Sequence, residues 1–115
     1  MSESKLRDLS TDFAVKAIKL TETIHGHRSI VNQLERSATS IGANIREANY
    51  AHGKADFIAK LHIALKEAAE TEYWLILLTR TEYLTTIQSE SLMSDCLEIK
   101  KILIATLNKT KKAET

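Results

Sequence analysis

Ser37-Ala-Thr-Ser-Ile-Gly-Ala-Asn-Ile-Arg-Glu-Ala48 is the stretch of the chain that decides its fold. Apolar residues run through and ahead of it at alternating intervals of three and four residues: Val31, Leu34, Ala38, Ile41, Ile45 and Ala48. This spacing is typical of one face of an α-helix that packs against other helices. Beside it, small or polar residues follow the same spacing: Ser37, Ser40, Asn44 and Glu47. The stretch therefore predicts a packed helix, and it contains no enzyme signature.

Gly42 lies in the middle of this predicted helix. A glycine at an interior helical position costs about 1 kcal/mol relative to alanine. A glycine kept at that cost commonly allows two backbones to approach closely. We therefore expect another helix to pack near Gly42.

The same periodicity predicts three more helices. We expect the four helices over residues 5–24, 29–51, 55–81 and 89–108. The predicted inward-facing residues outside the opening stretch are Leu6, Leu9, Phe13, Ala17, Leu20, Ile24, Phe57, Leu61, Ala64, Ala68, Thr71, Leu75, Leu78, Leu92, Cys96, Ile99, Leu103 and Leu107. Gly26, Gly53 and a short polar segment separate the helices, and short connections make neighbouring helices antiparallel. The sequence predicts an all-α, antiparallel, up-down-up-down four-helix bundle in one domain, residues 1–115.

Composition limits the compartment and the partners. The chain has 115 residues, 16 basic against 15 acidic side chains and a net charge of +1. No strong field therefore draws it to nucleic acid. Its single cysteine, Cys96, suits a reducing compartment, and Met1-Ser-Glu-Ser-Lys-Leu-Arg-Asp8 is charged rather than signal-like. The longest apolar run, Trp74-Leu-Ile-Leu-Leu78, is far shorter than the roughly 18–20 residues that span a bilayer. We expect a cytoplasmic protein without membrane contact.

Few residues suggest catalysis or metal binding. A di-metal site in a helical bundle needs two Glu-x-x-His pairs, and the chain has one, Glu22-Thr-Ile-His25, at the end of a predicted helix. Cys96 lies on an apolar line, which favours a core residue over a reactive thiolate. The glycines are too far apart to form a phosphate loop. We predict no catalytic residue, no metal site and no cofactor.

Glu47 and Glu72 border the inward-facing lines of their predicted helices. A carboxylate near a core needs a partner, because an unpaired buried charge costs several kcal/mol. One interpretation is a metal or proton-transfer site. The interpretation that we favour is a polar network of Ser37, Ser40, Asn44, Glu47 and Glu72 that fixes the helix register.

Several apolar residues lie outside the predicted core lines. They are Ile63, Tyr73, Ile76 and Leu77 on the third helix, Met93, Leu97 and Ile104 on the fourth, and Val15 and Ile18 on the first. A helix that is apolar on more than one face is buried either centrally or by another subunit. Four helices cannot enclose the third one completely, so we expect self-association through these residues. The alternative is the ordinary scatter of apolar residues on a small bundle.

Basic residues on the hairpin formed by the second and third predicted helices are candidates for phosphate contacts. They are Arg28, Arg36, Arg46, Lys54, Lys60 and Lys66. Acidic residues are interleaved with them, as on an ordinary mixed-charge surface, so charge alone does not favour nucleic-acid binding. An oligomer would repeat such a surface and add its phosphate contacts together.

Ser40-Ile-Gly-Ala-Asn-Ile-Arg-Glu-Ala48 resembles the Ser-Ile-x-x-Asn-Ile-x-Glu-Ala/Gly motif of the bacterial four-helix-bundle protein family, also called the 23S rRNA intervening-sequence protein family. Leu34-Glu-Arg-Ser37 is similar to the Leu-x-Arg-Ser segment of that family. Phe57 to Glu67 and Glu72-Tyr-Trp-Leu75 are similar to its third helix. The chain departs from the pattern at Gly26-His-Arg28, where many members have a proline, and at Ala48, which is often glycine.

The resemblance implies an antiparallel four-helix bundle that assembles into a homopentamer and has no enzymatic activity. Members are encoded in insertions within 23S rRNA genes. A related branch comprises accessory proteins of diversity-generating retroelements, which bind nucleic acid and a reverse transcriptase through a basic surface. We therefore expect a non-enzymatic, homo-oligomeric scaffold that associates with RNA, DNA or a nucleoprotein such as a reverse transcriptase complex. The alternative is a module that docks a different protein through its outer apolar face.

Overall fold

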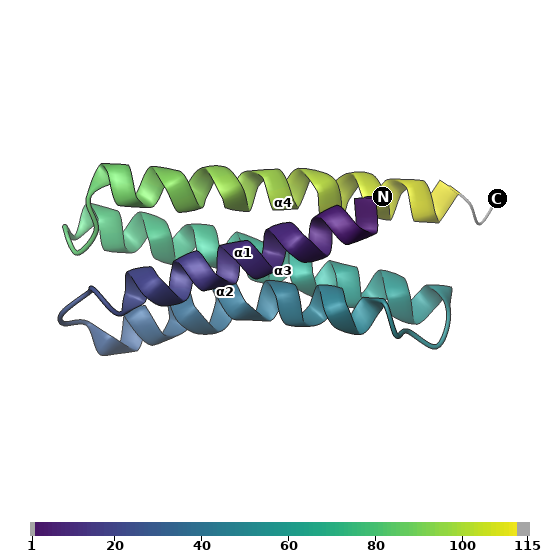
Figure 1. Cartoon of the computed structure of the whole chain (residues 1–115), viewed down its shortest axis with the longest axis horizontal. Helices are drawn as coiled ribbons and strands as arrows, with labels where there is room; N and C mark the ends of the chain where they lie inside the picture. Colours follow the sequence, from purple (N-terminus) through teal and green to yellow (C-terminus); the bar gives the residue numbers. More distant parts are fainter. Residues whose placement is uncertain (1, 113–115) are drawn as a thin grey trace.

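The computed structural model describes residues 2–112 and the side chains of residues 5–112. Its four helices are α1 Ser2–Thr21, α2 Arg28–Ala48, α3 Lys54–Arg80 and α4 Thr86–Lys112. Successive helices run in opposite directions, so that α1 begins at the end of the molecule where α4 ends (Figure 1). No strand occurs within residues 2–112. The predicted all-α, up-down-up-down four-helix bundle is confirmed.

Each helix packs against two neighbours. The packed pairs are α1–α2, α2–α3, α3–α4 and α1–α4, and α2–α3 is the most extensive of them. Across the diagonals, the described parts of α1 and α3, and of α2 and α4, make no close backbone approach. Each packed pair therefore forms one edge of the bundle, and the α1–α2 edge lies opposite the α3–α4 edge. The molecule measures 49 × 21 × 19 Å, because α3 and α4 are 27 residues long.

The buried core follows the predicted apolar lines. None of the six apolar residues that precede or belong to the opening stretch is more than 3% exposed. The predicted lines of α3 and α4 are also buried, except that Phe57 is only partly buried, as are Leu9 and Leu20 of α1. Burial of one such aliphatic or aromatic side chain stabilises the fold by about 1.5–3 kcal/mol. The core is therefore the main source of stability of the bundle.

The helix ends differ from the predicted ones by one to four residues. α4 begins three residues earlier than predicted, because Thr85 and Gln88 form a capping box. The backbone N–H of Gln88 donates to Thr85 Oγ1 at 3.1 Å, and that of Thr85 donates to Gln88 Oε1 at 2.9 Å. α1 ends at Thr21, although Ile24 beyond it remains buried as predicted.

The α1–α2 and α3–α4 connections meet at one end of the bundle. Gly26 has a φ of +101°, and a Cβ at this position would lie 3.1 Å from Tyr83 Cε1. The next residue, His27, has a φ of 42°, and its ring stands edge-on to Tyr83 with 4.7 Å between the ring centroids. Tyr83 therefore joins the two connections, and Gly26 is required both by its backbone angle and by this contact.

Gly42 faces α1, which confirms the prediction that another helix packs near it. A Cβ at Gly42 would lie 3.4 Å from Ser10 Oγ and 3.5 Å from the Ser10 carbonyl oxygen. These are ordinary van der Waals distances, so the packing is close without excluding a methyl group.

Within the described residues, no helix is long and apolar enough to cross a membrane.

Candidate functional site

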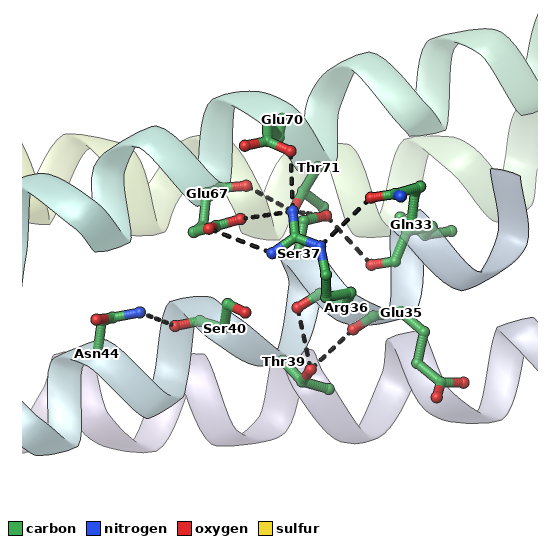
Figure 2. Close-up of polar contacts among 11 residues, drawn as sticks. Gln33, Glu35, Arg36, Ser37, Thr39, Ser40, Asn44, Glu67, Glu70 and Thr71 are labelled. Carbon is green, nitrogen blue, oxygen red and sulfur yellow. Dashed lines mark hydrogen bonds and ion pairs between the residues drawn. The ribbon is translucent and has the colours of Figure 1, made fainter. Parts of the chain in front are cut away.

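Polar side chains line the edge between α2 and α3, and Arg36 contacts several of them (Figure 2). Arg36 Nη2 lies 3.2 Å from Glu67 Oε1 and 2.9 Å from Glu70 Oε1. Arg36 Nη1 lies 3.4 Å from Glu67 Oε2, and Arg36 Nε donates to Gln33 Oε1 at 3.3 Å. The hydrogen bond with Glu67 is the main cause that raises the pKa of Arg36. Because Glu67 is only 9% exposed, this guanidinium neutralises a carboxylate at the rim of the core.

Ser37 and Thr71 join α2 to α3 inside the core. Both residues are fully buried, and their hydroxyl oxygens lie 2.9 Å apart. Thr71 Oγ1 also lies 2.8 Å from the Glu67 carbonyl oxygen, and Ser37 Oγ lies 3.3 Å from the Leu34 carbonyl oxygen. Both buried hydroxyls therefore have hydrogen-bond partners, one within each helix and one between the helices.

Asn44 and Glu47 occupy the same side of α2 but have different partners. Asn44 Nδ2 donates to the carbonyl oxygen of Ser40, one turn earlier on its own helix, at 2.9 Å (Figure 2). Glu47 reaches α3 at the surface, where Lys60 Nζ lies 2.9 Å from Glu47 Oε1. The hydrogen bond with Glu47 raises the pKa of Lys60. Of the predicted polar residues, Ser37 and Glu47 thus contact α3, while Asn44 bonds within α2.

Glu72 lies on the α4 side of α3, apart from the other predicted polar residues. Its Oε2 atom pairs with Lys100 Nζ at 2.6 Å, and both side chains are largely buried. Cys96, one turn before Lys100, donates from Sγ to the Ala68 carbonyl oxygen at 3.4 Å. Burial raises the pKa of the Cys96 thiol to about 12, so the thiol stays protonated and unreactive near neutral pH. The predicted polar residues therefore belong to two clusters, one on each side of α3.

The chemistry of these clusters favours a role in helix register. Each glutamate described above has a cationic partner. A carboxylate that accepts hydrogen bonds from a cation has fewer lone pairs free for a metal ion. Among the described residues, no group of three or more His, Cys, Asp and Glu side chains is placed to hold a metal ion. The geometry therefore fits a polar network between helices better than a metal or proton-transfer site.

The sequence contains a further signal, the distance of each residue from Gly53, for the charged pairs between α2 and α3. Arg36 and Glu70 lie 17 residues before and 17 residues after Gly53, and Glu47 and Lys60 lie 6 before and 7 after it. Residues equidistant from the turn of an antiparallel helix pair stand at about the same height. Reflection of the sequence about Gly53 therefore identifies the oppositely charged partners.

The six basic candidates do not form one uniform patch. Arg36 and Lys60 are ion-paired with glutamates, as described above. Arg28 donates to Asn32 Oδ1 at 3.2 Å and Arg46 donates to Thr11 Oγ1 at 3.3 Å, so both contact neutral partners. Lys54 and Lys66 are exposed and have no ion-pair partner in the described part of the chain. Four of the six cations thus remain uncompensated by an acidic partner.

Exposed apolar residues gather along two opposite edges of the bundle. On α1, Val15 and Ile18 are 46% and 40% exposed. They lie four and seven residues after Thr11, which contacts Arg46 of α2, so they belong to the α1–α2 edge. We call them the α1–α2 apolar face.

The second gathering surrounds the Glu72–Lys100 ion pair. Ile76 lies one turn after Glu72, and Leu97 and Ile104 lie one turn before and after Lys100. These three residues are 43–45% exposed, and the half-buried Met93 lies one turn before Leu97. We call these four residues the α3–α4 apolar face.

Three predicted interface residues lie elsewhere on α3. Ile63 is 40% exposed and lies one turn before Glu67, so it belongs to the α2 side of α3. Tyr73 is 53% exposed and packs against the Trp74 ring at a centroid distance of 5.0 Å. Leu77 is only half-exposed. The α3–α4 apolar face therefore contains four of the nine residues that were predicted to form an interface, and the α1–α2 apolar face contains two more.

The fold and its paired polar clusters define an antiparallel four-helix bundle whose charged side chains join helix to helix. Within this class, the chain belongs to the 23S rRNA-intervening sequence protein family, whose family model matches residues 2–105. The resemblance that was based on Ser40 to Ala48 is thereby confirmed.

The chain is also similar to a solved structure from Bacteroides thetaiotaomicron. That structure is described as a protein with unknown function from the S23 ribosomal protein family. The two chains are 50% identical, with a TM-score of 0.89, and the match covers 94% of this chain and 99% of the other. No curated protein matches the chain.

Proposed function

We propose that the chain is a non-enzymatic scaffold that forms a homo-oligomeric ring and associates with RNA or a nucleoprotein. The observation that carries the oligomer is the pair of apolar faces on opposite edges of the bundle. Exposed apolar clusters of this kind mark interaction surfaces. Because the two faces differ and lie on opposite edges, a contact between them repeats from copy to copy, and it closes into a ring when the rotation between successive copies divides a full turn evenly. The resemblance described above supports five copies.

Charge features support the association with RNA. Arg28, Arg46, Lys54 and Lys66 lack an acidic partner among the described residues, and a ring would present several copies of each. The family description names 23S rRNA intervening sequences, which favours RNA over other polyanions as the first ligand to test.

The oligomer is tested by size-exclusion chromatography with light scattering. We expect a mass several times the 12.9 kDa of one chain at micromolar concentration. Leu97→Glu places a charge in the α3–α4 apolar face and should yield monomer, because a buried unpaired carboxylate opposes association. Ile87→Glu is the matched control, since Ile87 is 81% exposed and lies outside both faces. A monomeric native protein would refute the ring and favour a module that docks a different protein.

RNA association is tested by titration of a single-stranded RNA across a salt series. Binding at low salt should weaken as salt increases, because phosphate contacts release counterions. Lys54→Glu combined with Lys66→Glu should reduce both the affinity and the salt slope. Absence of binding at low salt, or binding that salt does not change, would count against a phosphate-contacting surface.

A further inference from the structure

A groove runs along α4 beside the first turns of α1. It encloses about 420 Å³ and is lined by Lys5 of α1 and by Lys101, Ile102, Ala105, Thr106 and Lys109 of α4. A second hollow of about 580 Å³ shares Lys5, Lys101 and Ile102 and continues toward Ser94, Leu97 and Glu98. We call the first of these the lysine groove.

Three cations surround the lysine groove without a counter-charge. Lys5, Lys101 and Lys109 are exposed, and no acidic side chain of the described residues forms an ion pair with any of them. Lys16 of α1 and Lys100 of α4, by contrast, each pair with a carboxylate. The charged residues that line the lysine groove itself are therefore all basic, while Glu98 lies in the adjoining hollow. An anionic partner would lower the repulsion among the three ammonium groups.

Between the lysines, the groove has a low and mostly apolar floor. Ile102 and Thr106 are half-buried, and Ala105 is exposed with only a methyl group to fill space. The same groove thus offers apolar contact in its middle and positive charge along its length. A ligand that uses both features carries apolar groups flanked by acidic ones.

The length of the groove favours a helical ligand. Lys101 and Lys109 are eight residues apart, which is about 12 Å, or two turns, along α4. An amphipathic helix laid into a groove presents side chains at this same spacing. A nucleic acid fits less well, since no aromatic side chain lines the groove for a base to stack on. Phosphate groups would also leave the apolar floor uncovered.

We propose that the lysine groove binds an acidic amphipathic helix from another protein. Acidic residues two turns apart on that helix pair with Lys101 and Lys109, and apolar residues between them cover Ile102 and Ala105. Lys5 reaches the same helix from the α1 side. This inference goes beyond the RNA-associated ring proposed above and does not depend on it.

The test uses the full chain and a fluorescently labelled helical peptide of about 15 residues. The peptide carries glutamates two turns apart on one face and leucines between them, and a control peptide has glutamine in place of glutamate. We expect fluorescence anisotropy to show binding of the first peptide that weakens about tenfold or more in Lys101→Glu combined with Lys109→Glu. Lys19→Glu, a charge reversal at an exposed position of α1 fourteen residues from Lys5, should change the affinity by less than about twofold.

Ala105→Glu provides a second variant that does not depend on the lysines. Ala105 is exposed, so this change should leave the fold intact, as circular dichroism can verify, while a carboxylate in the floor repels the peptide.

Equal binding of the glutamate and glutamine peptides, or no binding at low salt, would overturn the proposal. Stronger binding of a single-stranded oligonucleotide, lost in the same lysine variants, would instead make the groove a phosphate site. A change of oligomeric mass in these variants would make it a contact between copies of this chain.

Discussion

Arg36 shows how single residues stabilise this bundle. It pairs with Glu67, which is nearly buried, and with Glu70, which is more exposed. We predict that Arg36→Met lowers the free energy of unfolding by about 1–2 kcal/mol, because it leaves the Glu67 carboxylate at the core rim without a cation. Urea denaturation measures the loss. Arg36→Met combined with Glu67→Met should recover most of it, and a double variant as unstable as the single one would contradict this explanation.

Cys96 gives the bundle a specific dependence on alkaline pH. Burial raises the pKa of this thiol from 9.0 to about 12, so the folded chain holds the proton more tightly than the unfolded chain. The resulting stability is fully present below pH 9 and is lost as the pH rises toward 12. We predict that the free energy of unfolding falls more steeply between pH 9 and 12 in the native chain than in Cys96→Ala. Equal slopes in the two proteins would show that the thiol does not contribute.

Asn44 provides a test of the register hypothesis. Its side chain bonds to Ser40 of its own helix, whereas Ser37 and Thr71 make the buried link between α2 and α3. If Asn44 fixes the register, Asn44→Leu should lower stability or change the oligomeric mass. Thermal unfolding and light scattering of this variant check the hypothesis, and unchanged values in both would refute it.

At the scale of elements, the connections between helices differ in how strictly they require glycine. Gly26 has a positive φ and faces Tyr83 at short distance, whereas Gly53 has an extended backbone with open space around its Cα. We predict that Gly26→Ala lowers the free energy of unfolding by about 1–2 kcal/mol. Gly53→Ala is the matched control and should change it by less than about 0.5 kcal/mol. Chemical denaturation of both variants measures the difference, and equal effects would contradict this account of the Gly26 connection.

At the scale of the whole molecule, the arrangement of the apolar faces predicts an unusual mixing behaviour. Ile18→Glu should disable the α1–α2 apolar face, and Leu97→Glu the α3–α4 apolar face, so each variant alone should be monomeric. An equimolar mixture retains one intact pair of faces and should form a heterodimer of twice the chain mass. Light scattering of the mixture measures this outcome. A mixture that stays monomeric would contradict the head-to-tail contact.

The sequence alone determined the helical class, the four helices and nearly all of the core. The reason is local, because a helix places residues three and four apart on one face whatever lies beyond it. The motif around Gly42 was also sufficient to indicate the family. The predicted helix ends are less accurate, because the capping box of Thr85 and Gln88 starts α4 three residues before the predicted position.

Only the tertiary structure decided which polar groups meet. Glu72 and Glu47 look alike in the sequence, yet Glu72 pairs with α4 in a half-buried position and Glu47 pairs with α3 in a more exposed one. The lysine groove likewise brings Lys5 together with residues between Lys101 and Lys109, which lie near the other end of the sequence. Periodicity assigns each residue to a face of its own helix, but the partner across the gap depends on the rotation and the height of two packed helices. Those two quantities are set by the packing of the entire core.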